Sequence, residues 1–376
     1  DFGGGIYSED AVTLTDSTVI NNIADQGGGI RVANGAVSLI ASILTGNTAN
    51  DGGGGIYSFS GDMTFVDSTI SDNQAKRGGG ISSSSATVTL MGSTVSGNTA
   101  NLEGGGIYAR FDAVTVIESS VSGNSSGDRG GGIYIQDDDE LTLVDSTVSN
   151  NLSVGAGGGI RLDDGGATIT NSTVSGNSAG GSGGGLRAGP GSVTIVGSTF
   201  TGNSAASNGG GLTTAANGAT ISGSIISGNT ADGTGNEIRD TGSLSLDAYN
   251  LIGDSTQTTN DALDGVNAGA SDLLATSNEL NVVLGAILAP LTDNGGPTAT
   301  HALVAGSPAL DMGDPAAMAG VGDVPEFDQR GAGFDRVFND RIDIGAFELQ
   351  ASAVIDCDFD DDGACDVGDI DALVAE

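Results

Sequence analysis

A phrase of three glycines followed by Ile or Leu recurs through the first two thirds of the chain. The apolar residue that ends each copy is Ile6, Ile30, Ile56, Ile81, Ile107, Ile133, Ile160, Leu186 and Leu212, at steps of 24 to 27 residues. A second phrase, most often S-T-V-S-G-N, keeps the same period and ends at Asn22, Asn47, Asn73, Asn98, Asn124, Asn151, Asn177, Asn203 and Asn229. Two phrases that share one period indicate a repeat architecture rather than a single globular core.

Within each repeat, apolar and hydroxyl side chains alternate. In the fourth repeat, Val88 and Leu90 flank Thr89, and Val95 precedes Asn98 by three residues. This alternation is typical of a strand with one face in the core. The residue before the Asn is always Gly, Asn or Asp, the types that tolerate positive φ, so we expect a corner there. Each repeat therefore predicts three short strands: one after the glycines, one around V-T-L and one around S-T-V.

A single repeat of about 26 residues cannot bury its inward side chains, but coils stacked about 4.8 Å apart would pair every strand with its neighbours. The sequence therefore predicts an all-β fold, a parallel β-helix of about ten coils with a C-terminal cap and a short tail. We expect it to be right-handed, as parallel crossovers generally are. The recurring Ser and Asn would form hydrogen bonds from coil to coil.

The composition along the chain suggests four parts. The repeats occupy residues 1–254 and end in a degenerate tenth coil that contains Ile238. Residues 255–283 lose the period and are expected to form an irregular connection. Residues 284–349 hold five of the six prolines and predict a cap that closes the open end of the columns. Residues 356–376 form an acidic tail.

The charge limits the classes of partner. The chain has 48 acidic and 11 basic residues, a net charge of −37 at pH 7. Nucleic acid and anionic membranes are therefore poor partners. No apolar run is long enough for a transmembrane helix. Because the sequence opens inside a repeat without Met, we expect a signal peptide and an N-terminal cap to precede it, and a secreted, extracellular protein.

The position after each Ile or Leu of the glycine phrase forms a possible binding surface. It holds Tyr7, Arg31, Tyr57, Ser82, Tyr108, Tyr134, Arg161, Arg187, Thr213 and Arg239, which we call the outer row. We expect these side chains to point away from the core and to be exposed. Tyr57, Tyr108, Tyr134, Arg161 and Arg187 are the candidate ligand-binding residues, because aromatic faces and guanidinium groups bind sugar rings. Ordinary cross-strand pairing is the alternative explanation.

Catalysis is a second possibility for this surface. Asp137 and Asp163 lie close to the outer row, and together with Arg161 and Arg187 they are the candidate catalytic residues. An Arg beside a calcium-binding acidic patch on a β-helix resembles pectate-lyase-like enzymes, which implies proton abstraction by Arg. The single histidine, His301, is expected to form structural hydrogen bonds instead. A further Thr column, which includes Thr94, Thr147, Thr173 and Thr199, resembles a flat ice-binding face.

Other phrases in the sequence resemble known modules. The repeats resemble bacterial β-helix surface proteins of the polymorphic outer membrane protein type. The segments NLIGD (Asn250 to Asp254), LTDNGGPTATHALVAGSPALDMGD (Leu291 to Asp314), FDQRG (Phe327 to Gly331) and DIGAFE (Asp343 to Glu348) resemble the choice-of-anchor Q domain. That resemblance implies a secreted bacterial protein with a surface-attachment signal and no catalytic role for the domain.

The acidic tail has the pattern of a calcium loop. Asp358, Asp360, Asp362, Asp366 and Asp369 occupy positions 1, 3, 5, 9 and 12 of a twelve-residue loop, with Gly363 at position 6. Hard oxygen ligands at this spacing suit Ca²⁺. The tail is similar to half of a dockerin, which implies a cohesin-like partner. Cys357 and Cys365 flank the first half of the loop, where an oxidising exterior would allow a disulfide.

Together these features predict a secreted protein, attached to a cell surface or matrix, that acts as an adhesin or structural spacer and contacts glycans. The alternative is a polysaccharide lyase, or another carbohydrate-active β-helix enzyme, that uses the exposed Arg and Asp side chains.

Overall fold

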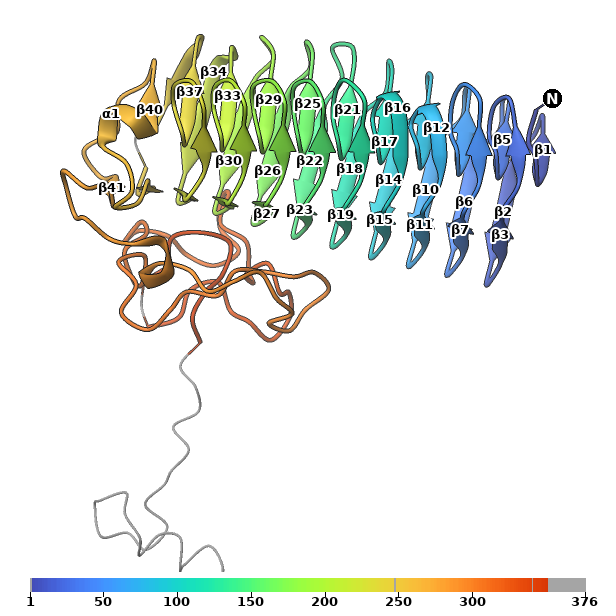
Figure 1. The fold of residues 1–376 in the computed structure, drawn as a ribbon. Helices are drawn as coiled ribbons and strands as arrows, with labels where there is room; N and C mark the ends of the chain where they lie inside the picture. Colours follow the sequence, from blue (N-terminus) through green and yellow to red (C-terminus); the bar gives the residue numbers. More distant parts are fainter. Residues whose placement is uncertain (1, 247, 340, 351–376) are drawn as a thin grey trace, which may run out of the picture.

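The computed structural model describes residues 2–246, 248–339 and 341–350. The chain winds into a parallel β-helix, in which successive coils place their strands side by side in long sheets (Figure 1). This arrangement confirms the predicted fold class. It differs from the prediction in one respect, because the coils supply strands to four sheets rather than three.

The first sheet is built from the strands that follow the glycines. Its eleven strands are β1 (Ile6–Ser8), β5 (Ile30–Val32), β9 (Ile56–Ser58), β13 (Ile81–Ser83), β17 (Ile107–Ala109), β21 (Ile133–Ile135), β25 (Ile160–Leu162), β29 (Leu186–Ala188), β33 (Leu212–Thr214), β37 (Ile238–Asp240) and β40 (Leu263–Asp264).

The second sheet is built from the V-T-L segments. Its ten strands are β2 (Val12–Thr15), β6 (Val37–Ile40), β10 (Met63–Val66), β14 (Val88–Met91), β18 (Val114–Ile117), β22 (Leu141–Val144), β26 (Ala167–Thr170), β30 (Val193–Val196), β34 (Asn217–Ser222) and β38 (Ser243–Ser245).

The third sheet is built from the S-T-V segments. Its eleven strands are β3 (Thr18–Ile20), β7 (Ile43–Thr45), β11 (Thr69–Ser71), β15 (Thr94–Ser96), β19 (Ser120–Ser122), β23 (Thr147–Ser149), β27 (Thr173–Ser175), β31 (Thr199–Thr201), β35 (Ile225–Ser227), β39 (Leu251–Ile252) and β41 (Leu273–Leu274).

The fourth sheet is built from the segments that follow the recurring Asn of each coil. The sequence pattern did not predict it. Its nine strands are β4 (Ile23–Ala24), β8 (Thr48–Ala49), β12 (Gln74–Arg77), β16 (Thr99–Glu103), β20 (Ser125–Ser126), β24 (Leu152–Ser153), β28 (Ser178–Ala179), β32 (Ser204–Ala205) and β36 (Thr230–Ala231). Most of these strands have two residues, too few for a visible alternation. A column of Ala and Ser two residues after the Asn was the available signal.

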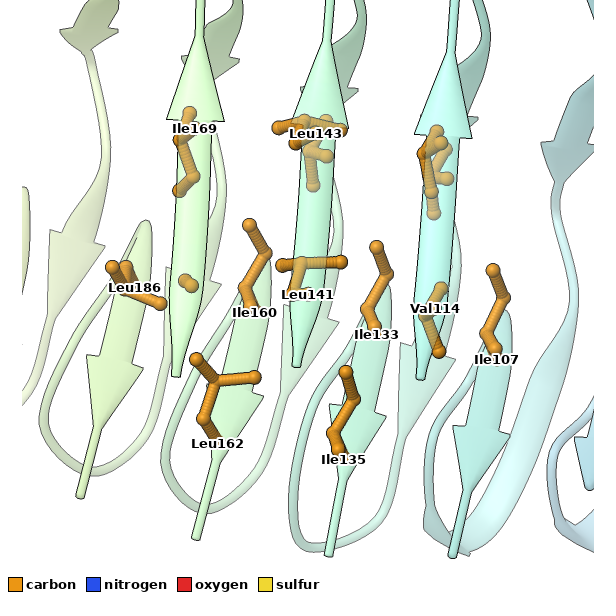
Figure 2. Packing of buried hydrophobic residues seen from close by; sticks show 14 of the residues in the cluster. Ile107, Val114, Ile133, Ile135, Leu141, Leu143, Ile160, Leu162, Ile169 and Leu186 are labelled. Carbon is orange, nitrogen blue, oxygen red and sulfur yellow. The ribbon is translucent and has the colours of Figure 1, made fainter. Parts of the chain in front are cut away.

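The core is a set of continuous apolar columns. Ile107, Ile133 and Ile160 stack on one another in the first sheet, and Val114 and Leu141 stack in the second (Figure 2). All five are fully buried. This register confirms the inward positions that the alternation predicts.

The glycines let neighbouring coils approach closely. Gly104 has a φ of +64°, a backbone conformation that side chains with a Cβ rarely adopt. A Cβ on Gly105 would lie 2.3 Å from the carbonyl oxygen of Gly131, and one on Gly106 would lie 2.7 Å from that of Gly132. Any larger residue at these positions would push the next coil away.

The Asn column forms a buried ladder. The Nδ2 of Asn98 donates to Oδ1 of Asn124 at 3.0 Å, and the Nδ2 of Asn124 donates to Oδ1 of Asn151 at 2.9 Å. The same Nδ2 of Asn124 also donates to the carbonyl of Val95 in the previous coil. The ladder therefore satisfies side chains and backbone together, as predicted.

The Ser column forms a second ladder, in which the backbone N–H of Ser198 donates to Oγ of Ser224 at 3.0 Å. Both ladders end on a carboxylate. The Asn ladder ends at Glu237, whose Oε2 accepts from Nδ2 of Asn229. The Ser ladder continues from Ser224 to Asn250, and Nδ2 of Asn250 donates to Oδ1 of Asp272 at 3.0 Å. Asn250 therefore takes the place of the Ser in the tenth coil.

Glu237 should make stability depend on pH. Burial raises the pKa of Glu237 to about 8, and hydrogen bonds from Asn229 and Gln257 offset part of this effect. The carboxyl is protonated in the folded state below that pH, whereas the unfolded chain loses its proton near pH 4.5. The contribution of Glu237 to the free energy of unfolding is therefore fully present below the unfolded pKa. It is lost as the pH rises to about 8, at up to about 1.4 kcal/mol per pH unit.

We therefore expect the denaturant midpoint to fall between about pH 5 and about pH 8, and to fall less in Glu237→Gln, which mimics the protonated carboxyl. Denaturant titrations of both proteins at several pH values measure the difference. Identical pH slopes for the two proteins would contradict the raised pKa.

Residues 255–283, expected to be an irregular connection, are partly regular. They contain a short helix, α1 (Thr259–Ala262), capped by Thr258, and strands β40 and β41 extend the first and third sheets. Val266, Ala268 and Leu274 pack against the end of the apolar core. The columns are therefore closed by this segment.

Residues 284–349 do not close the end of the columns, contrary to the prediction. After a 3-10 helix, η1 (Leu284–Ala286), this C-terminal segment runs alongside the third sheet (Figure 1). Oγ1 of Thr147 donates to the carbonyl of Ala299, Oγ1 of Thr173 donates to Oε1 of Gln329, and the backbone N–H of Ala346 donates to Oγ1 of Thr199. The Thr column proposed as an ice-binding face is thus buried from β23 to β31.

The polar residues of the FDQRG and DIGAFE phrases hold this segment together. Arg330 pairs with Asp328 and lies 3.8 Å from the ring centroids of both Phe334 and Phe347. Nη1 of Arg336 donates to Oε2 of Glu348 at 2.9 Å. These charged residues therefore form a buried network that stabilises the C-terminal segment.

Candidate functional site

The outer row is continuous along the first sheet. Each member pairs in register with the next, for example Tyr108 with Tyr134, Tyr134 with Arg161, and Arg161 with Arg187. The row ends where Arg239 pairs with Asp264 of β40. The predicted register is therefore confirmed.

The expected exposure of the tyrosines is wrong. The exposed fractions of Tyr57, Tyr108 and Tyr134 are 9%, 6% and 1%. Their hydroxyls reach the loop of the next coil: that of Tyr57 donates to Oγ of Ser84, that of Tyr108 to Oε1 of Gln136, and that of Tyr134 to Oδ2 of Asp163. These loops cover the rings, so the three tyrosines support the surface rather than form it. Of the outer-row tyrosines, Tyr7 is exposed.

Asp163 is the centre of a charged cluster. Its Oδ2 accepts from the hydroxyl of Tyr134 at 2.6 Å and from Nη1 of Arg129 at 3.4 Å. Its Oδ1 accepts from Nε of Arg161 at 2.7 Å. Burial, followed by the bond to Asp163, raises the pKa of Tyr134. The structure thus unites two predicted catalytic residues, Arg161 and Asp163, but saturates the carboxylate with three donors.

Arg187 differs from its neighbour Arg161. Its Nη1 donates to the carbonyl of Ala188 at 2.8 Å, and among the described residues no carboxylate forms a salt bridge with it. Burial lowers the pKa of Arg187, and the positive charge of Arg161 in the adjacent strand adds to this effect. This half-buried guanidinium is the outer-row group best placed to accept an external partner.

Asp137 lies in a different pair. Its Oδ2 is 3.6 Å from Nε of Arg110, and no hydrogen bond or salt bridge joins it to Arg161, Asp163 or Arg187 in the part of the chain that is described. Nearby, Asp112 is buried and accepts from Ser83 and from the backbone N–H of Ser85. Burial raises its pKa to about 6.

Sequence reasoning missed Arg129, Gln136 and Asp112. Arg129 stands directly before the glycine phrase, in line with Glu103 of the previous coil. Charged residues at that position were the available signal. Gln136 and Asp112 belong to loops that do not repeat, and no pattern marked them.

His301 and the tail complete the predicted sites. Nε2 of His301 lies 2.8 Å from Oγ of Ser175, and Nδ1 lies 2.8 Å from the carbonyl of Ala289. These bonds confirm the structural role predicted for His301, whose pKa is lowered by burial.

The proposed calcium ligands Asp358, Asp360, Asp362, Asp366 and Asp369 lie outside the described residues. Within those residues, no three acidic, His or Cys side chains come together in a way that could hold a metal ion.

The outer row therefore offers a long, rigid ridge rather than a convergent centre. The carboxylate of Asp163 beside it is already paired, while Arg187 has capacity for a hydrogen-bond acceptor. Such a surface suits contact with an extended ligand along the axis of the β-helix.

Comparison with known proteins identifies the family. The family described as "Right handed beta helix region" matches residues 5–157 and residues 132–282, which together span well over half of the chain. The searches of curated proteins and of solved structures gave no match. In the described residues, no helix is long and apolar enough to cross a membrane. The period of the glycine phrase, the four parallel sheets and the family match agree, and the chain belongs to the right-handed β-helix family.

Proposed function

We propose that this protein is a secreted, surface-attached β-helix that acts as a spacer or adhesin and contacts glycans through the outer row. The observation that carries the proposal is the ridge itself, in which charged side chains pair along the axis and leave Arg187 without a carboxylate partner among the described residues. A guanidinium group can donate two parallel hydrogen bonds to sugar hydroxyls or carboxylates. The fold is consistent with surface and carbohydrate-related proteins.

Attachment is proposed from the C-terminal sequence. The segments that resemble a choice-of-anchor Q domain, and the tail that is similar to half a dockerin, would fix the rod to a cell surface or to a cohesin-like protein. A rigid solenoid ahead of such a module would hold its ridge away from the surface. Fractionation of the producing cells, with antibody against the β-helix, would detect the full chain on the surface; recovery only from the cytoplasm would contradict the proposal.

Binding through the outer row is tested by removal of one positive charge. We expect Arg187→Ala to weaken binding to glycans selected from an array by at least about tenfold, since one charge-assisted hydrogen-bond donor is lost. Lys76→Ala is the matched control, because Lys76 is an exposed cation on the fourth sheet and its loss changes the net charge equally. Equal affinities of the two variants would remove the outer row from the binding surface.

A polysaccharide lyase remains the second candidate, favoured by the lowered pKa of Arg187 beside Arg161. A neutral guanidine there would take the proton next to a sugar carboxylate, while the glycosidic oxygen leaves and a carbon–carbon double bond forms. The absorbance of unsaturated products, measured with uronate polymers, distinguishes the two functions. Product formation that disappears in Arg187→Ala would establish the enzyme; no absorbance with any polymer would favour the adhesin or spacer.

Calcium is proposed to order the tail. We expect the full chain to bind Ca²⁺ with measurable heat, and the double variant Asp358→Asn with Asp360→Asn to lose that heat, because hard oxygen ligands with negative charge set the affinity. Asp10→Asn with Asp232→Asn is a control with the same change in net charge, because both residues are exposed. Unchanged calorimetry in the tail variant would show that the loop is not a calcium site.

A further inference from the structure

A cavity lies away from the outer row, where the C-terminal segment meets the β-helix. It is a cavity of about 370 Å³ between the corner that follows strands β30 and β34 and the loop of residues 314–325. Val196, Gly197 and Tyr249 line the side of the β-helix, and Ala317, Pro325 and Arg336 line the side of the C-terminal segment. We call this the seam cavity.

Arg336 places an unused donor at the seam cavity. The residue is 1% exposed, and its Nη1 donates to Oε2 of Glu348. Its Nη2 donates to the backbone carbonyls of Asp343 and Gly345. Its Nε is buried and has no hydrogen-bond partner among the described residues. A buried donor without an acceptor is costly, which points to an acceptor supplied from outside the chain.

The position of this donor relative to Gly197 links it to the cavity. A Cβ built on Gly197 would lie 3.9 Å from Nε and 3.2 Å from Nη2 of Arg336. Gly197 lines the seam cavity and carries no side chain that could cover the guanidinium group. No side chain of Gly197 therefore separates this donor from the cavity.

The walls restrict the chemistry of the ligand. Val196, Val324 and Ile342 give the cavity an apolar lining, and Tyr249 adds an aromatic side chain. Asp314 and Asp323 are exposed at its edge, so that a negatively charged ligand would be repelled and hydroxyl donors would be accepted. The carboxylate of Asp343 is already occupied by the backbone N–H groups of Asp311 and Leu349. The ligand therefore needs an apolar face against the walls, a hydrogen-bond acceptor within the cavity and hydrogen-bond donors at its edge. It carries no negative charge.

The hollow continues along the second sheet. A neighbouring, more open hollow of about 260 Å³ shares Val196, Asp323 and Pro325 with the seam cavity and is lined by Thr168, Thr170 and Thr194. Thr168 and Thr194 are paired in adjacent strands, so their hydroxyls repeat at the strand spacing of about 4.8 Å. A row of hydroxyls beside an apolar cavity suits a chain of linked rings rather than one small molecule.

From these features we propose that the seam cavity and the adjoining Thr-lined hollow bind a neutral polysaccharide, with one sugar ring held in the cavity. A ring hydroxyl accepts from Nε of Arg336, other hydroxyls donate to Asp314 and Asp323, and the C–H face of the ring packs on Tyr249 and the aliphatic wall. This inference rests on the proposed contact with glycans and adds the seam as a second glycan-binding surface beside the outer row. It also names the class of glycan as uncharged.

The test fills the cavity without a change in charge. Ala317 lines the cavity, whereas Ala319 of the same loop is exposed and does not, so Ala317→Trp is the test variant and Ala319→Trp its matched control. Neutral gluco-, manno- and galacto-oligosaccharides and uronate oligomers are titrated into the full chain by calorimetry. We expect a neutral oligosaccharide to bind, Ala317→Trp to weaken that binding at least tenfold, and Ala319→Trp to leave it unchanged.

The outcomes separate this inference from the proposed function. If Ala317→Trp binds normally and Arg187→Ala does not, the outer row is the binding surface and the seam inference is overturned alone. Binding of uronate oligomers only, or no binding of any neutral oligosaccharide, also overturns it. Should Ala317→Trp lower the thermal midpoint, Asp323→Asn serves instead, because its side chain is exposed; at least a threefold loss of affinity is then expected.

Discussion

Replacement of Asn124 by alanine is expected to lower the free energy of unfolding by at least about 3 kcal/mol, because three buried polar groups each lose a partner at about 1 to 3 kcal/mol. Those groups are the backbone N–H and the Nδ2 of Asn98, which donate to Oδ1 of Asn124, and the carbonyl of Val95, which accepts from its Nδ2. No water can reach them, since Asn98 and Asn124 are 0% and 1% exposed. The change would interrupt the ladder in the middle of the β-helix.

Denaturant titration followed by circular dichroism measures this effect. Asn101→Ala is the matched control, because Asn101 is an exposed residue of β16 in the preceding coil, and we expect it to change stability by less than about 0.5 kcal/mol. Similar midpoints for the two variants would mean that the ladder fills space without satisfying the backbone.

Leu90→Ala is expected to lower the free energy of unfolding by about 2 to 5 kcal/mol, because the buried side chain loses its transfer free energy and leaves a cavity behind. Leu90 is fully buried and stacks between Phe65 and Val116 of the neighbouring coils. A solenoid cannot easily collapse around the void, because the backbone spacing on both sides is set by hydrogen-bonded strands. The thermal or denaturant midpoint reports the loss.

Thr89→Ala, one residue away, tests the direction of the side chains. Thr89 lies on the outer face of β14 and is half-buried, so its truncation should cost far less than that of Leu90. If the two variants are destabilised equally, the assignment of inner and outer faces is wrong.

The parts of the fold that repeat could be predicted from the sequence. The columns that contain Leu90 and Asn124 recur in every coil, and repetition turns a weak local pattern into a firm register. The fourth sheet was missed because strands such as β8 have two residues, and two residues show no alternation. Its Ala and Ser column provides one inward position in each coil, and a single position shows no period.

The parts that do not repeat could not be predicted. The burial of Tyr134 depends on Asp163 and Arg129, which lie in loops of different coils with unrelated sequences. The position of the C-terminal segment on the third sheet depends on hydrogen-bonded pairs such as Thr147 and Gln329, which are far apart in the chain. An outward-facing Thr looks the same in sequence whether water or another segment covers it.

The ladders also determine how the rod could change length. Because each coil pairs like residues with like, removal of residues 99–124 would bring Asn98 onto Asn151 with every column intact, and the rod would shorten by one strand spacing of about 4.8 Å. The C-terminal segment spans the third sheet from β23 to β35, so the same excision there would take away part of its seat. The half of the rod that precedes β23 is therefore free to gain or lose whole coils by duplication or deletion, while the coils that follow are held to a fixed number by the segment that crosses them.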